Sequence, residues 1–155
     1  MKISITPTFD TELSSGASIV HELAKELGLF FEDKEYGDSV QKIGIGLLMV
    51  FHRPGFEHLF KPRRPYYVDK EIESPLTGEK IKVEKYLGIE IRLKDNALDS
   101  IMKGTPVEVQ LVVLSVIYDY LMTLDKLPLK ARDFKKKQFL ADLDRFKKQL
   151  ETALS

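Results

Sequence analysis

Residues 60–67 form a basic and aromatic segment whose side chains are suited to binding chemistry. Guanidinium groups grip carboxylates and phosphates, while tyrosine rings offer large contact areas and stack on nucleobases. Three interpretations are open: a proline-stiffened loop whose tyrosines cover a sheet edge, which is favoured, a surface that binds a protein, or one that binds nucleic acid. The candidate contact residues are Arg63, Arg64, Tyr66 and Tyr67.

A second cluster of candidate residues is acidic and lies around a turn. Its carboxylates lack the alternating Asp or Asn and the glycine of a calcium loop, so we expect no metal there. Either they form a solvated helix end, or they form a contact patch for a basic partner. The candidate contact residues of this turn are Glu32, Asp33, Glu35, Tyr36 and Asp38.

The remaining reactive residue types do not assemble into a catalytic set. The three histidines, His21, His52 and His58, lack the spacing of metal ligands on a helix. A loop-borne site around His58 is the alternative, but no nucleophile or paired acid accompanies it. The absence of cysteine excludes disulfides, thiolate metal sites and a cysteine nucleophile. We therefore predict a protein that is not an enzyme and that has no catalytic residue, cofactor or metal.

The elements that must position these residues follow from the apolar spacing. Apolar and charged residues alternate from Ile81 to Leu93, which predicts a strand with one exposed face. Beyond Asp95 the apolar residues recur at helical spacing. We expect strands over residues 2–6, 43–51, 66–72 and 80–93, and helices over residues 11–31, 96–102, 106–124 and 133–154.

Local signals refine these elements. Residues 74–79 contain Pro and Gly and predict a hairpin between the third and fourth strands. Lys85 falls on the otherwise apolar face of the fourth strand, so either its stem snorkels at the sheet margin or a bulge shifts the register. Thr105, Pro106 and Glu108 match a capping box. Gly104 is placed to end the preceding helix, and Gly28 could end the first helix early.

These elements predict one α+β domain over residues 1–155. The expected architecture has two layers, with a mainly antiparallel four-stranded sheet and helices packed on one face, in the order β-α-β-β-β-α-α-α. The stretch from Val107 to Leu124 is strongly apolar, but Glu108 and Asp119 interrupt it. We therefore interpret it as a buried helix and predict no membrane partner.

The charge is balanced overall but uneven along the chain. The formal net charge is zero, which argues against nucleic acid as a partner. Residues 1–40 carry three lysines against eight acidic residues, whereas residues 125–150 carry nine basic residues against four acidic ones. The lysine runs at 135–137 and 147–148 are interpreted as a solvated helix face. The first residues lack the apolar segment of a signal peptide, so a cytoplasmic location is expected.

Five short motifs, taken in order, resemble the immunity protein 44 family, a group of bacterial immunity proteins. The resemblance covers roughly residues 1–125, and the lysine-rich final helix and the hairpin around Pro75 fit the pattern less well. The motifs are the opening strand Met1–Ile5, the turn Lys34–Val40, the strand Ile43–Leu48, the stretch Phe60–Pro65 and the strand Leu87–Leu93.

The resemblance implies a class of function but transfers no site residue. Proteins of this group are cytoplasmic antidotes encoded beside polymorphic toxins. It implies an antitoxin that neutralises a cognate toxin domain by protein–protein contact, and the acidic first segment would suit a cationic, nuclease-like toxin. The alternative is a small non-enzymatic adaptor or regulatory module. The sequence leaves the oligomeric state open.

Overall fold

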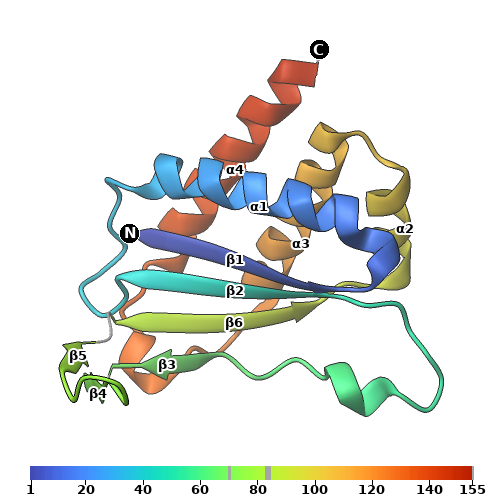
Figure 1. Cartoon of the computed structure of the whole chain (residues 1–155). Helices are drawn as coiled ribbons and strands as arrows, with labels where there is room; N and C mark the ends of the chain where they lie inside the picture. Colours follow the sequence, from blue (N-terminus) through green and yellow to red (C-terminus); the bar gives the residue numbers. More distant parts are fainter. Residues whose placement is uncertain (70, 83–84, 155) are drawn as a thin grey trace.

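The computed structural model of the chain describes residues 1–69, 71–82 and 85–154 (Figure 1). Four helices form where the apolar periodicity predicts them, and short 3₁₀ turns lie at Thr11–Leu13, Glu57–Phe60 and Leu129–Ala131. The strands and helices are β1 (Lys2–Phe9), α1 (Ser14–Phe31), β2 (Lys42–Met49), β3 (Tyr66–Val68), β4 (Glu71–Glu73), β5 (Lys80–Lys82), β6 (Tyr86–Arg92), α2 (Asp95–Lys103), α3 (Pro106–Thr123) and α4 (Lys136–Leu154).

The main sheet is mixed, so the predicted mainly antiparallel sheet is wrong. Its strand order is β1-β2-β6-β3, in which β1 and β2 are parallel, β2 and β6 are parallel, and only β3 runs antiparallel to β6. The physical reason lies in the connections. The helix α1 carries the chain back along β1, so β2 starts again from the same end and pairs in parallel.

The predicted third and fourth strands are each interrupted. Their inner parts are β3 and β6, and their outer parts, β4 and β5, pair as a separate two-stranded hairpin. Residue 70 and residues 83–84 of the predicted strands lie outside the described residues. If the register of the Val68↔Tyr86 pair continued outward, the partner of Glu71 would be residue 83. The observed partner of Glu71 is Lys82. The two pairings therefore differ in register by one residue.

Lys85 reaches the sheet margin, as one of the two interpretations of that residue expected. Its ammonium group donates to the carbonyl of Asp38 at 3.2 Å, and its own carbonyl accepts from the backbone N–H groups of Gln41 and Lys42. Lys85 therefore connects the start of β6 to the loop that leads into β2.

One face of the main sheet is buried under the helices. Alternate residues of β2 and β6, such as Ile45, Leu47, Leu87 and Ile89, are at most 3% exposed and join the core with α1, α3 and α4. The opposite face carries half-buried or exposed side chains, and Figure 1 views the molecule from this side. Because the helices cover only one face, the other stays open.

The helix α3 is the most apolar helix and lies at the centre of the helical layer. Val109, Val113 and Leu114 are fully buried, and the helix contacts α1, α2 and α4. By length and composition it is the one helix in the described part of the chain that could cross a membrane, a test that the core helix of a soluble protein also passes. One third of this helix is buried, and five of its residues belong to the hydrophobic core.

The capping box at the start of α3 is confirmed. The Thr105 hydroxyl accepts from the Glu108 backbone N–H, and the Glu108 carboxylate accepts from the Thr105 N–H, both at 3.3 Å. Gly104 directly follows the last residue of α2, as predicted, although its backbone is extended with φ of −81° rather than left-handed. Gly28, the possible early end of the first helix, lies inside α1. A Cβ on Gly104 would lie 2.8 Å from the Ser100 carbonyl oxygen, so tight packing explains glycine there.

Thr105→Ala should lower the free energy of unfolding by about 1 kcal/mol, because the Glu108 N–H loses its acceptor at the helix start. The control is Thr123→Ala in the last turn of the same helix, whose hydroxyl donates only to the Asp119 and Tyr120 carbonyls. That change should stay within about 0.5 kcal/mol. Urea denaturation measures both variants, and equal losses would contradict a specific role for the cap.

Candidate protein-binding surface

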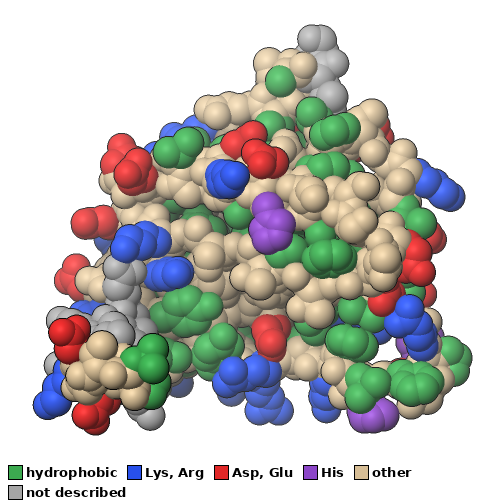
Figure 2. Space-filling model, in the orientation of Figure 1, with side chains coloured by type: hydrophobic (Ala, Val, Ile, Leu, Met, Phe, Trp, Pro, Cys, Tyr) green, Lys and Arg blue, Asp and Glu red, His purple; other side chains and the backbone are tan. Residues whose placement is uncertain are grey.

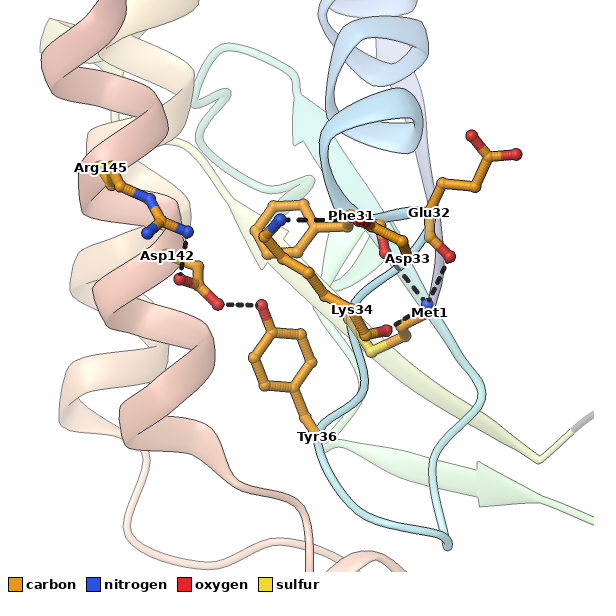
Figure 3. Close-up of polar contacts among 8 residues, drawn as sticks. All are labelled: Met1, Phe31, Glu32, Asp33, Lys34, Tyr36, Asp142 and Arg145. Carbon is orange, nitrogen blue, oxygen red and sulfur yellow. Dashed lines mark hydrogen bonds and ion pairs between the residues drawn. The ribbon is translucent and has the colours of Figure 1, made fainter.

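The acidic turn between α1 and β2 is anchored by Tyr36. This side chain is 2% exposed, and its ring packs on Phe31, Phe134 and Phe139 at centroid distances of 5.4 to 6.2 Å. Its hydroxyl donates to the carboxylate of Asp142 on α4 (Figure 3). Tyr36 therefore lies in the core rather than on the surface, where its prediction as a contact residue had placed it. Its role is to hold the turn in place.

The burial of Tyr36 also changes its acidity. Desolvation raises the pKa of its phenol well above the ordinary value, and the hydrogen bond and negative charge of Asp142 raise it further. Asp142 is held in turn by Arg145, whose guanidinium donates to the other carboxylate oxygen at 2.7 Å. The neutral phenol is thus the form that the fold requires.

Backbone contacts fix the turn at both ends. The Lys135 N–H donates to the Tyr36 carbonyl at 2.8 Å. Gly37 has φ of +107°, and a Cβ there would lie 2.8 Å from the Asp133 carbonyl oxygen, so only glycine fits. At the end of α1, the Met1 ammonium group donates to the carbonyls of Phe31 and Lys34 at 3.0 and 2.5 Å (Figure 3).

A groove of about 560 Å³ opens beside this turn, and we call it the acidic groove. The exposed carboxylates of Glu32, Glu35 and Asp38 line it. Asp33 is not among the residues that line the groove, and its carboxylate, on a side chain that is 86% exposed, lies 3.6 Å from the Lys34 ammonium. The groove is completed by Met1, Lys2, Gly37, Val40, Gln41 and Lys85.

The second predicted segment lies across the open face of the sheet. The guanidinium of Arg63 stacks on the Tyr66 ring at 3.9 Å from its centroid, and the Arg63 N–H donates to the Glu90 carboxylate at 2.7 Å. Tyr66 in turn lies 6.1 Å from Tyr86, centroid to centroid. We call Arg63, Tyr66, Tyr86 and Glu90 the aromatic platform.

Two glycines create the space for this platform. A Cβ on Gly88 would lie 2.2 Å from the Tyr66 ring, and one on Gly44 would lie 1.7 Å from the Tyr86 hydroxyl oxygen. The two glycines are paired across β2 and β6, so the rings lie directly on the strand backbone. Figure 2, which looks onto this face, shows hydrophobic side chains over the strands and Lys and Arg side chains below them.

The other two residues of the segment take different positions. The Tyr67 hydroxyl donates to the Ser39 carbonyl at 2.6 Å, which ties β3 to the end of the acidic turn. Arg64 is exposed and makes no hydrogen bond or ion pair with any residue that the structure describes. Tyr67 and Lys85 thus bring the two predicted segments close together, because both bind carbonyls of residues 38–39.

Sequence reasoning did not select Tyr86, Glu90 and Lys85 as candidate binding residues. The signal was present, because Tyr86 and Glu90 occupy the polar positions of the alternating strand at residues 81–93. What the sequence lacked was the strand order that brings them beside Tyr66 and the acidic turn.

The histidines take no part in this surface. His52 lies 3.6 Å from the Glu57 carboxylate, and His21 and His58 are exposed. Within residues 1–69, 71–82 and 85–154, no group of three or more His, Asp or Glu side chains is arranged to hold a metal ion.

The Tyr36 hydroxyl should make stability sensitive to alkaline pH. Above pH 10 the unfolded chain releases this proton while the folded chain keeps it, so the free energy of unfolding falls as pH rises. Tyr36→Phe should cost about 1 kcal/mol at pH 7 through the lost hydrogen bond. Between pH 10 and 11 the free energy of unfolding of the variant should fall less steeply with pH than that of the wild type. The two slopes should differ by up to about 1.4 kcal/mol per pH unit. Equal slopes in urea denaturation would contradict this assignment.

A known protein family matches most of the chain. The sequence fits the family described as Immunity protein 44 over residues 1–149 of 155. No curated protein and no solved structure matches the chain. The match ends at residue 149 and so includes most of α4, which the sequence motifs alone had left outside the resemblance. The chain belongs to the immunity protein 44 family.

Proposed function

We propose that this protein neutralises a cognate bacterial toxin domain in the cytoplasm by binding it, without chemical turnover. Membership of the immunity protein family supports the class of function. The observation that carries the proposed mechanism is the acidic groove, whose three carboxylates are exposed on a turn that the core holds rigid.

Rigidity matters because an inhibitor must bind before the toxin does damage. A loop that is already fixed loses little conformational entropy when its partner arrives. The turn at residues 32–38 is held by the buried Tyr36 ring, by the Lys135 N–H and by the close contact at Gly37. Its carboxylates are therefore presented in one arrangement while they remain open to solvent.

Charge indicates the kind of partner. Three carboxylates in one groove favour a basic surface, such as the nucleic-acid-binding face of a nuclease domain. Opposite charges also steer the two proteins together and raise the association rate. The aromatic platform lies next to the groove and adds Arg63 and two tyrosine rings, the residue types that dominate binding energy at interfaces.

Co-expression with the toxin domain of the adjacent gene tests the proposed function. We expect this protein to restore growth of cells that express the toxin domain, and the two proteins to co-purify as a complex. The control is the unrelated toxin domain of another system, which should not be neutralised. No rescue and no complex with the adjacent toxin would overturn the proposal.

Reversing the charge of the groove tests the mechanism. Glu35→Lys combined with Asp38→Lys should slow association with the toxin domain about tenfold at low salt, and by less at high salt because ions screen the attraction. The matched control is Glu12→Lys with Glu26→Lys, which changes the net charge equally at two exposed acids on other elements. Stopped-flow mixing gives the rates. If both pairs slow association equally, overall charge and not the groove is responsible.

A further inference from the structure

A second concave site lies where the chain passes from α3 to α4, and we call it the basic pocket. Its volume is about 680 Å³. Leu124, Leu127 and Phe134 give it apolar lining. Its charged lining consists of five basic residues and one acid: Lys126, Arg132, Lys135, Lys136, Lys137 and Asp125.

The basic residues of the pocket differ from those farther along α4. In the second half of α4, Arg145, Lys147 and Lys148 each lie within 4.0 Å of a carboxylate on the same helix. In the basic pocket, Lys126, Arg132, Lys135 and Lys137 have no ion pair with any residue that the structure describes. Their like charges repel one another, and a bound carboxylate would relieve this repulsion.

The basic pocket is built rather than formed by loose side chains. The ammonium of Lys136 donates to the Leu124 carbonyl at 2.6 Å, which joins the end of α3 to the start of α4. Phe134 is 5% exposed and packs in the core beside Tyr36 and Phe139. The pocket thus has two fixed walls, the end of α3 and the segment that leads into α4. Because both are held in place, they need little rearrangement to accept a ligand.

We propose that the basic pocket is a second contact site for the toxin, and that it takes an acidic segment of that protein with an apolar residue among its carboxylates. This inference rests on the proposed function. The carboxylates would meet the unpaired cations, and the apolar residue would cover Leu124, Leu127 and Phe134. The pocket thus complements the acidic groove, to which the Tyr36–Lys135 backbone hydrogen bond connects it.

The chemistry of the lining favours a protein over the other occupants. A nucleic acid backbone offers phosphates along a track, and those phosphates gain nothing from an apolar floor. A second copy of this chain offers the acidic groove, but Lys2 and Lys85 share that groove with its carboxylates and weaken the match.

The test removes one cation from each side of the pocket, Lys126 after α3 and Lys135 before α4. Lys126→Gln with Lys135→Gln should weaken the toxin complex about tenfold at low salt, as expected when charges at an interface lose their partners. The matched control is Lys94→Gln with Lys103→Gln, two exposed and unpaired lysines at the ends of α2, which should change Kd less than about twofold. Calorimetric titration with the toxin domain of the adjacent gene gives Kd, and thermal melting confirms that the variants fold.

The outcomes separate this inference from the proposed function. If the wild type does not bind the toxin domain, both fail. If the wild type binds and the pocket variant binds equally well, the basic pocket is not a contact site, although the proposed function stands. The inference is also overturned if the pocket variant abolishes a wild-type dimer in light scattering, or abolishes binding of a labelled single-stranded RNA, while the toxin complex is unchanged.

Discussion

An aromatic cluster at one end of the molecule holds together three parts of the chain that are far apart in sequence. Phe31 ends α1, Tyr36 lies in the acidic turn, and Phe134 and Phe139 lie at and near the start of α4. Burying each such ring contributes about 1.5–3 kcal/mol, and the edge-to-face contacts between rings add to this. Both charged sites depend on this cluster, since it fixes the turn that lines the acidic groove and the segment that lines the basic pocket.

The sheet adds the other constraint on the surface. Because α1 returns the chain to the starting end of β1, the central strands are parallel and their first residues meet at one edge. The loop into β2 and the start of β6 therefore lie side by side, where Lys85 binds the Asp38 carbonyl. Helices cover one face of this sheet, and paired glycines on the other face leave room for two tyrosine rings against the strand backbone. The result is a fixed surface with acidic, aromatic and basic parts.

Local features of the sequence were enough to predict the helices and the start of α3. The capping box and the 3.6-residue periodicity are encoded within a few residues, so neighbouring residues suffice to recognise them. Strand order was not predictable in the same way, because pairing depends on contacts across the chain. The signal that was overlooked is the helix between the first two strands, which itself favours a parallel pair.

The candidate site was only partly predictable, because its segments are local but the contacts between them are not. The acidic and the basic–aromatic segments were found from residue type alone, and the structure brings them close together. The burial of Tyr36 could not be read from its acidic neighbours, because the rings that cover it come from residues 134 and 139. The basic pocket was equally hidden. Its lysines looked like a solvated helix face until the structure separated the paired cations from the unpaired ones.

The central claim is that this protein acts by occupying a surface of its toxin, one molecule for each molecule inhibited. Titrating a fixed amount of the purified toxin domain with this protein, and measuring the remaining toxin activity, tests that claim directly. Activity should fall in proportion to the added protein and reach zero near one equivalent. Complete loss of activity at a small fraction of one equivalent would show turnover and contradict the account.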